Sequence, residues 1–228
     1  MRYLKIVFTL LLITKLAVAN AQGTSKDQFV QIKTNVGTMI FQLSAEAPKH
    51  VANFLKLAKK GYFNTYDFNR VLKGFVAQGG ETDSAYAAME KNGVVLDRIP
   101  AEFSAKLFHQ RGALAAGRDD NPAKSSFLGQ IYIVDGRKYT DTQLDALEKR
   151  MGNGFKFTAE QRKTYKEFGG APNLDQNYTV FGQLVKGIGV FDQLMNQKAN
   201  KAGKPEVRIS LTVELLSKNK AKSLLTNN

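Results

Sequence analysis

Short segments in which apolar and polar residues alternate are the feature that most restricts the fold of this chain. Residues 29–34 (FVQIKT) and 37–43 (GTMIFQL) alternate on either side of Asn35-Val36-Gly37, a sequence typical of a β-hairpin turn. Further strands are predicted at residues 112–117, 130–135, 178–185 and 207–215. Because only two framework helices accompany them, the pattern predicts a mainly β fold, a closed antiparallel barrel.

The two framework helices are predicted from the spacing of their apolar residues. Pro48 suits a first helical turn, and the apolar residues that follow recur at helical spacing until Gly61 ends the helix. The second helix is predicted around residues 190–195, directly after a strand. Residues 81–93 are read as a loop, and residues 217–228 as a basic, frayed C-terminal tail.

The N-terminal residues predict a secretory signal peptide over residues 1–21. Arg2 and Lys5 precede a short apolar run at residues 7–13, and small residues at 17–21 offer cleavage sites. The run is too short to span a bilayer. We therefore expect cleavage after Ala21, export to a bacterial periplasm, and no membrane span in the mature chain. Residues 22–28 form a polar leader before the folded domain, residues 29–216.

The absence of cysteine from the 228 residues excludes disulfides, thiolate catalysis and cysteine metal sites. The two histidines, His50 and His109, are far apart in sequence and have no metal-ligand spacing. We read His109 as a structural hydrogen-bonding residue and His50 as exposed on the first helix. No metal and no cofactor are expected.

The chain is strongly basic. The signal peptide carries three cations and no acid, so its removal changes the net charge from +13 to +10 (13 − 3). A basic surface can attract nucleic acid or anionic membranes. However, the cations are scattered and form no arginine-rich stripe interleaved with aromatics. We therefore expect a solvated surface and no nucleic-acid partner.

Residues 136–171 interrupt the succession of strands with two predicted helices. The first begins with the capping box of Thr140 and Gln143, and the second with that of Thr158 and Gln161. The segment is too short to hold a core of its own. It is therefore predicted to be a helical insertion at the edge of the barrel and not a second domain.

The stretch FNRVLKGFVAQGG, residues 68–80, is the strongest candidate for a functional site. It contains one arginine, Arg70, with an aromatic ring at Phe75 and an amide at Gln78, and a glycine pair ends it. It contains no histidine, cysteine or carboxylate. Any reaction that this stretch catalyses must therefore proceed without a nucleophile or a general base from within it.

From about residue 29 to residue 215 the order of motifs resembles the cyclophilin-type peptidyl-prolyl cis-trans isomerases. The matching stretches are APKHVANFLKLAKKGYF, FNRVLKGFVAQGG, RGALAAG, GQIYIV and LDQNYTVFGQLVKG. The resemblance implies an eight-stranded antiparallel barrel capped by two helices and catalysis of rotation about X-Pro bonds. The insertion is similar to one in secreted bacterial members, especially those of Bacteroidetes.

The resemblance also implies the roles of individual residues. Arg70 matches the catalytic arginine, and Phe75 and Gln78 match the ring and the amide that act beside it. The implied substrate-binding residues are Asn69, Val76, Ala116, Gly117, Gln130, Tyr132, Leu174 and Tyr178. Simpler readings stay open: Arg70 as a surface strand arginine, the aromatic residues and Leu174 as barrel core, and the two glutamines as ordinary ladder or loop amides.

Several positions depart from the family pattern. Asn69 stands where a histidine is common, Val76 replaces a methionine, and Ile131 replaces a phenylalanine. Asn173 occupies a place where many members carry tryptophan or another large side chain. These departures affect the expected rate and sequence preference more than the type of reaction.

We therefore expect a monomeric isomerase that acts on proline-containing exported polypeptides and assists their folding. The alternative is a chaperone or scaffold that binds proline-containing segments with little turnover. A third reading is adhesion of the basic surface to nucleic acid or anionic envelope polymers. We also expect the insertion, which returns to the chain just before Asn173, to shape one end of the substrate groove.

Overall fold

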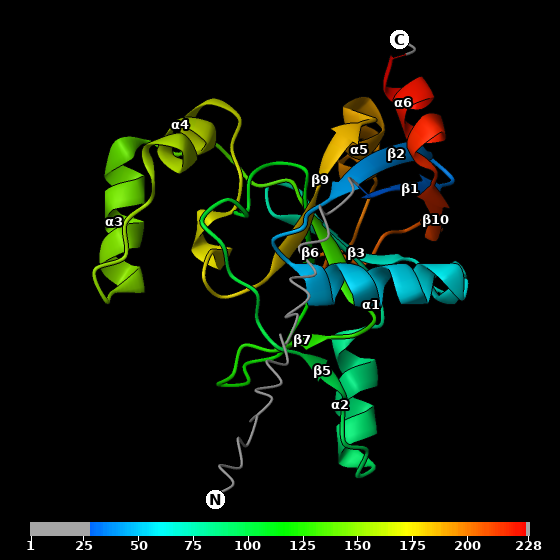
Figure 1. The fold of residues 1–228 in the computed structure, drawn as a ribbon. Helices are drawn as coiled ribbons and strands as arrows, with labels where there is room; N and C mark the ends of the chain where they lie inside the picture. Colours follow the sequence, from blue (N-terminus) through cyan, green and yellow to red (C-terminus); the bar gives the residue numbers. More distant parts are fainter. Residues whose placement is uncertain (1–27, 227–228) are drawn as a thin grey trace, which may run out of the picture.

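The computed structural model describes residues 28–226, so the predicted signal peptide and nearly all of the polar leader lie outside the described residues. Eight antiparallel strands form one curled sheet in the order β10-β1-β2-β9-β6-β8-β4-β3 (Figure 1). Its strands are β1 (Gln28–Thr34), β2 (Gly37–Leu43), β3 (Phe68–Leu72), β4 (Val76–Gly80), β6 (Ala113–Ala116), β8 (Gln130–Val134), β9 (Val180–Lys186) and β10 (Thr212–Leu216). A second sheet pairs β5 (Arg98–Ile99) with β7 (Ser126–Phe127).

The sheet is curled, but no ladder joins its two end strands, β3 and β10, within the described residues. The ends meet through single contacts: Phe68 N donates to Ile209 O at 2.9 Å, and Asp67 forms an isolated bridge with Ser210. The predicted strand at residues 207–215 therefore begins only at Thr212. The side chain of Asn35 explains the late start, because it donates to Arg208 O and accepts from Ser210 N in place of a strand partner.

The main core lies between the sheet and two helices, α1 (Pro48–Lys59) and α5 (Ile188–Met195). Pro48 occupies the first turn of α1, where its missing N–H has no helical partner to lose. Gly61 follows the helix with φ of 65°, a left-handed conformation that glycine adopts without a Cβ clash. The helices bury one face each, and the large side chains at their centres include Phe54 and Phe191.

His50 is buried in α1, so the prediction that it is exposed was wrong. Its side chain is 1% exposed, with Nδ1 2.7 Å from Glu102 Oε2 and Nε2 3.0 Å from Ser126 Oγ. The Glu102 carboxylate also accepts the backbone N–H groups of Lys49 and His50, both at 3.0 Å, and so satisfies the first turn of α1. Helical spacing on α1 cannot reveal a partner that lies 52 residues away.

Two further helices correct the sequence-based predictions. Residues 81–93, read as a loop, contain α2 (Asp83–Lys91), in which the Thr82 side chain accepts from Ala85 N at 3.1 Å. Tyr86 anchors α2 by stacking on Phe127 at 3.7 Å between ring centroids. The tail read as frayed forms α6 (Lys218–Thr226), which buries Ala221.

The insertion contains the two expected helices, α3 (Asp141–Met151) and α4 (Ala159–Glu167), and both capping boxes are present. Figure 1 shows them at one side of the molecule, away from α1, α5 and α6. A small apolar cluster holds them together, with one member, Phe108, supplied from outside the segment. The buried members of this cluster are Phe108, Leu144, Leu147, Phe157 and Tyr165.

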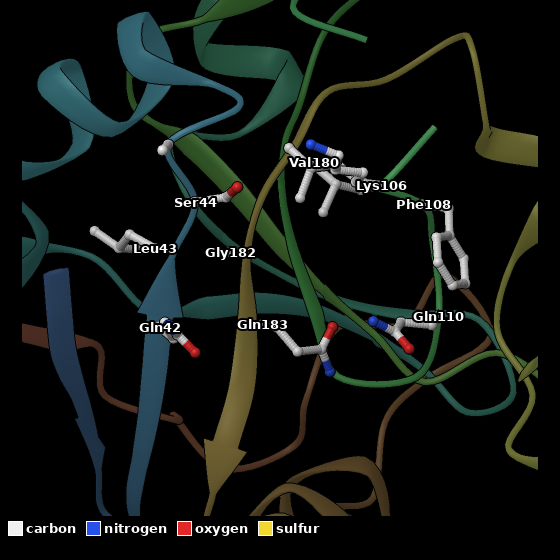
Figure 2. A pocket seen from close by; sticks show the side chains of 11 residues that line it. Gln42, Leu43, Ser44, Lys106, Phe108, Gln110, Val180, Gly182 and Gln183 are labelled. Carbon is white, nitrogen blue, oxygen red and sulfur yellow. The ribbon is translucent and has the colours of Figure 1, made fainter. Parts of the chain in front are cut away.

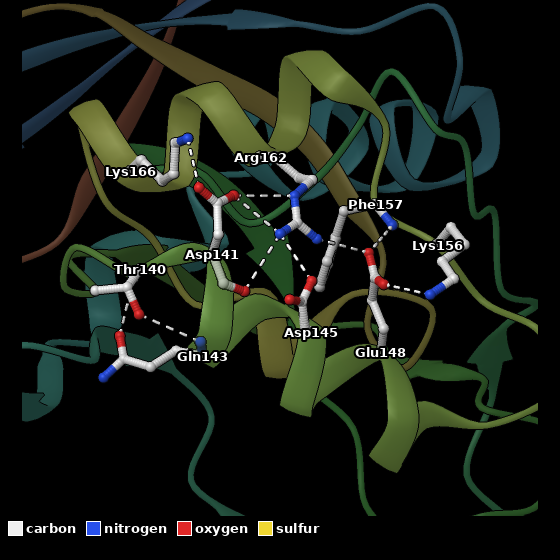
Figure 3. Close-up of polar contacts among 9 residues, drawn as sticks. All are labelled: Thr140, Asp141, Gln143, Asp145, Glu148, Lys156, Phe157, Arg162 and Lys166. Atoms are coloured by element: carbon white, nitrogen blue, oxygen red, sulfur yellow. Dashed lines mark hydrogen bonds and ion pairs between the residues drawn. The ribbon is translucent and has the colours of Figure 1, made fainter.

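Ion pairs around Arg162 join α4 to α3 (Figure 3). The guanidinium contacts Asp141 at 2.9 Å, Asp145 at 2.8 Å and Glu148 at 3.0 Å. Glu148 also pairs with Lys156 at 2.7 Å, and this cation, with the other contacts, lowers the pKa of the carboxyl. The insertion is thus held by a small core and a charged face.

No helix among residues 28–226 is long and apolar enough to cross a membrane.

Candidate active site

One pocket, with a cavity volume of about 130 Å³, gathers most of the residues proposed from the sequence. It is lined by Arg70, Phe75, Val76, Gln78, Asp83, Gly117, Arg118, Gln130, Tyr132, Leu174 and Tyr178. Nine of the eleven predicted site residues are in this set; Asn69 and Ala116 are not. Asp83 and Arg118 were missed. The roles of these side chains in binding and catalysis stay predictions.

Strand register builds one wall of the pocket, the sheet wall, defined here by Arg70, Gln78 and Tyr132. Arg70 of β3 lies opposite Gln78 of β4, and Gln78 lies opposite Tyr132 of β8. Directly opposed residues on neighbouring strands project to the same face of a sheet. Alternation therefore brings the cation, the amide and the ring together across three strands.

The guanidinium of Arg70 is half-exposed and makes no hydrogen bond or ion pair with any residue between 28 and 226. The guanidinium thus makes no hydrogen bond with the Gln78 amide, although the two residues are cross-strand neighbours. Instead the stem of Arg70 packs on Gly203, where an added Cβ would lie 3.1 Å from Arg70 Cγ. Gly203 O accepts from Val71 N at 2.7 Å. The stem is held by packing and the donors stay available to a ligand.

Gln130 has a fixed amide at the edge of the pocket. Its Nε2 donates to Glu81 O at 3.0 Å and to Asp83 Oδ1 at 2.7 Å. Its Oε1 lies over Gly117, where a Cβ would be only 1.9 Å away. Gly117 therefore leaves the space that this amide needs. Asp83 was overlooked because it belongs to α2, which the sequence pattern did not reveal.

Asn69 and Ala116 face away from the pocket for a reason that strand geometry supplies. Ala116 alternates with Ala115 along β6, so its side chain joins the main core while Ala115 packs with Tyr132 beneath the pocket. Asn69 Nδ2 donates to Gly80 O at 2.7 Å and ties β3 to the end of β4. The sequence motif correctly located both strands, but not which face each residue occupies.

The opposite wall, called here the loop wall, consists of Leu174 and Tyr178 from the segment before β9. Arg118 holds this wall: its guanidinium lies over the Tyr178 ring at 4.8 Å and its Nε donates to Asn177 O at 2.6 Å. Tyr178 in turn meets the Tyr132 ring edge-on at 6.0 Å. The loop wall is therefore positioned by side-chain contacts and not by a ladder.

Tyr132, the member of the sheet wall on β8, also forms the floor of the pocket, and its hydroxyl is hydrogen-bonded to His109. The distance from His109 Nε2 to Tyr132 Oη is 2.8 Å, and His109 Nδ1 lies 2.7 Å from Asp175 Oδ1. This confirms His109 as a structural hydrogen-bonding residue. Burial raises the pKa of Tyr132 well above its usual value. Its hydroxyl is therefore protonated at neutral pH.

A larger hollow of about 280 Å³ lies elsewhere, between β2, β9 and the loop that precedes β6 (Figure 2). Ser44, Lys106, Gln110 and Gln183 are among its lining residues. It contains none of the predicted site residues.

Within residues 28–226 no group of three His, Cys, Asp or Glu side chains is arranged to hold a metal ion.

Comparison with known proteins identifies relatives of this fold and this motif order. Residues 29–214 match the family model described as cyclophilin type peptidyl-prolyl cis-trans isomerase/CLD. A protein of Staphylococcus saprophyticus named as a peptidyl-prolyl cis-trans isomerase is 35% identical over 173 residues, 75% of this chain and 83% of the relative. A relative of the same name from Staphylococcus haemolyticus is 32% identical over 177 residues, 77% and 84% of the two chains.

Solved structures agree with this at the level of the fold. A cyclophilin-type isomerase of Cryptosporidium parvum superposes with a TM-score of 0.59 at 23% identity, covering 84% of this chain and 99% of that one. A second crystal structure of that protein, in the presence of the dipeptide Ala-Pro, gives a TM-score of 0.57 at 24% identity, covering 83% and 99%.

Proposed function

The chain belongs to the cyclophilin-type peptidyl-prolyl cis-trans isomerase family, and from that premise we propose that the pocket around Arg70 catalyses rotation of X-Pro bonds in exported polypeptides and so assists their folding. The observation that carries the assignment of the site is Arg70 itself. It is a cation without an internal partner in the described chain, on the wall of a pocket backed by rings and aliphatic side chains.

The reaction explains why the pocket needs no nucleophile. A peptide bond resists rotation with a barrier of about 18–20 kcal/mol, because the nitrogen lone pair is delocalised into the carbonyl. Before proline both isomers are populated and exchange slowly. No covalent bond breaks during the exchange, so the protein must only bind the twisted bond more tightly than either planar isomer.

Each wall of the pocket has a part in that selective binding. In the twisted bond the imide nitrogen becomes pyramidal and regains its lone pair, so a donor from Arg70 stabilises this state and not the planar ones. Phe75, Leu174 and the Tyr132 ring offer apolar contacts to the pyrrolidine, which anchors one side of the bond. Gln78 supplies an amide group for the backbone of the substrate. The N–H donors of Gln130 are taken by Glu81 O and Asp83 Oδ1 and leave only its carbonyl oxygen as an acceptor. The other side of the bond is then free to rotate.

A short peptide containing Ala-Pro is the natural test substrate, since a structural neighbour was crystallised in the presence of that dipeptide. NMR exchange spectroscopy on the peptide should show faster cis-trans exchange with the protein than in buffer. Arg70→Ala should abolish most of this acceleration without changing the circular dichroism. Arg208→Ala is the matched control, because Arg208 is exposed, pairs with Asp67 just before β3, and lies outside the pocket.

The outcomes of this test separate the hypotheses. Retention of full activity by Arg70→Ala would show that the pocket is not the site of rotation. Proline-dependent binding of the peptide without faster exchange would favour the alternative of a chaperone or scaffold. Loss of activity in both arginine variants would show that the lower positive charge of the surface, and not the pocket, explains the loss.

We also propose that the mature protein is a periplasmic monomer. The support is the signal-like N-terminal sequence, which lies outside the described residues. Mass spectrometry of the protein from a periplasmic fraction should give the mass of a chain that begins at Gln22. Light scattering of that sample should give the mass of one copy, whereas an intact N-terminus in the membrane fraction would contradict export.

A further inference from the structure

A buried chain of hydrogen bonds runs from the floor of the pocket to the helical insertion. It begins at the Tyr132 hydroxyl, 2.8 Å from His109 Nε2, and continues from His109 Nδ1 to Asp175 Oδ1 at 2.7 Å. It ends at Tyr165 of α4, whose hydroxyl is 2.5 Å from Asp175 Oδ2. The four residues are between 0% and 5% exposed. They come from β8, the loop before β6, the end of the Pro172–Leu174 turn, and the insertion.

The chemistry of these groups shows which atom donates in each hydrogen bond to the Asp175 carboxylate. The Asp175 carboxylate only accepts, and it also takes the backbone N–H of His109 at 2.9 Å. Nδ1 of His109 must therefore carry a proton, and Nε2 of the same ring pairs with the Tyr132 hydroxyl. Burial raises the pKa of Tyr165 well above its usual value, so this hydroxyl also donates, to the other carboxylate oxygen.

Packing at both ends makes this series of hydrogen-bonded side chains rigid. The His109 and Tyr132 rings are stacked with 14° between their planes, and the Tyr178 ring meets the Tyr132 ring edge-on. At the far end, Tyr165 packs edge-on against Phe108 and Phe157 of the insertion cluster. Displacement of Tyr165 would therefore be passed to the Asp175 carboxylate and the His109 ring.

The returning end of the insertion also lies directly on His109. Ala171 N donates to His109 O at 2.8 Å, and a Cβ at Gly170 would be only 2.2 Å from that oxygen. A phenylalanine in place of Tyr132 would provide an apolar floor with no polar group to satisfy. The buried hydroxyl of Tyr132 instead requires a hydrogen-bonding partner. That partner is His109, which is connected through Asp175 to Tyr165 of the insertion.

We propose that Tyr165, Asp175 and His109 are positioning residues through which the helical insertion orients Tyr132, and so sets how tightly a proline-containing segment is held. The proposal rests on the proposed function of the pocket. It makes the insertion a determinant of substrate affinity that acts from behind the pocket floor.

A double-mutant cycle on the two tyrosines tests the proposal. Tyr165→Phe, Tyr132→Phe and the double variant each remove a hydroxyl and keep the ring. One hydrogen bond contributes about 0.5–1.5 kcal/mol, so Tyr165→Phe should raise the Kd of the Ala-Pro peptide about two- to tenfold. In the background of Tyr132→Phe the same substitution should have no further effect. NMR line shapes give both the Kd and the exchange rate on the bound peptide.

Tyr139→Phe is the matched control in the same cluster. The Tyr139 ring packs on Tyr165 at 6.4 Å between centroids, but within residues 28–226 its hydroxyl has no hydrogen bond. This variant should leave the Kd unchanged. A loss of affinity equal to that of Tyr165→Phe would overturn the proposal, because the packing of the cluster would then explain both.

The imidazole nitrogens give a readout that does not depend on activity. The chain has two histidines, so the ¹⁵N signals of His109 can be separated from those of His50. Tyr132→Phe should shift Nε2 of His109, Tyr165→Phe should shift its Nδ1, and neither should move His50. Unmoved His109 signals would overturn the proposal. So would a Tyr165→Phe effect on the Kd that is equal in both backgrounds, or absent in both.

These failures are distinct from failure of the proposed function. If Arg70→Ala retains activity, the site itself is wrong. If Arg70→Ala is inactive and the tyrosine cycle shows no coupling, the site stands and only the link to the insertion is wrong.

Discussion

The sheet wall and the loop wall of the pocket hold their side chains by different means. Backbone hydrogen bonds fix the positions of Arg70, Gln78 and Tyr132 through strand register. Leu174 and Tyr178 lie outside the strands. Tyr178 is held by Arg118, and Asp175, the residue after Leu174, is held by His109 and Tyr165. A substitution in the sheet wall should therefore change chemistry with little movement, whereas one behind the loop wall should change position and hence affinity.

The largest effect is expected in the sheet wall at Arg70. Removal of a preorganised donor that acts on the transition state typically costs about 10²–10³ in rate, so Arg70→Ala should lower the exchange rate on bound peptide by about 100-fold or more. Arg70→Lys should recover part of this loss, since the charge remains and the planar fork does not. NMR exchange rates at saturating peptide measure both. Equal rates for the two variants would show that charge is irrelevant.

The largest effect on stability is expected behind the loop wall, at Asp175. Its carboxylate accepts three hydrogen bonds, and an amide has only one oxygen to replace two. Asp175→Asn should therefore lower the free energy of unfolding by about 1–3 kcal/mol. Urea denaturation measures this loss. Asp145→Asn, at an exposed ion pair of the insertion, is the control and should change stability by less than about 1 kcal/mol.

A smaller effect is expected at Arg118, which holds Tyr178. Loss of the cation–π contact and of the bond to Asn177 O should loosen the loop wall while Arg70 stays in place. For a contact of about 1 kcal/mol, Arg118→Ala should raise the Kd of the peptide about fivefold and change the rate on bound peptide less. Arg137→Ala removes a similar contact with Tyr139 outside the pocket and should change neither quantity.

The smallest effects are expected from pH. Arginine stays protonated, so the exchange rate should be nearly constant between about pH 6 and 9. Stability should behave differently, because burial lowers the pKa of His50 from 6.5 despite the opposing bond from Glu102. The unfolded chain then binds a proton more readily, and stability is lost as the pH falls below 6.5 through the lower folded pKa. His50→Gln should show a weaker dependence in urea denaturation at different pH values.

Local pattern was sufficient for several strands and for the insertion helices. The strand predicted at residues 130–135 corresponds to β8, and the two capping boxes located α3 and α4. These signals lie within a few residues of the structures that they specify, so a sequence displays them directly. The motif at residues 68–80, which contains β3 and β4, was assigned through the family resemblance and not through alternation. The same resemblance placed Asn69 and Ala116 at the pocket, because it matched positions along the chain without settling the face that each residue occupies.

The features that local pattern did not predict depend on partners that are distant in sequence. The burial of His50 depends on Glu102, 52 residues away, and His109 is held by Asp175, 66 residues away. Asp83 and Arg118 reach the pocket from segments without a strand or helix pattern that marks them. The residues just before β10 contact the side chain of Asn35, 173 to 175 residues away.

The sequence alone thus determined several of the strands, the helical insertion and an arginine in a motif that lacks a nucleophile. Tertiary structure decided which faces meet, which histidines are buried, and how the insertion contacts the pocket floor. The physical reason is that alternation and capping are interactions between near neighbours, whereas burial of a polar group depends on hydrogen-bonding partners that only the folded chain brings within reach.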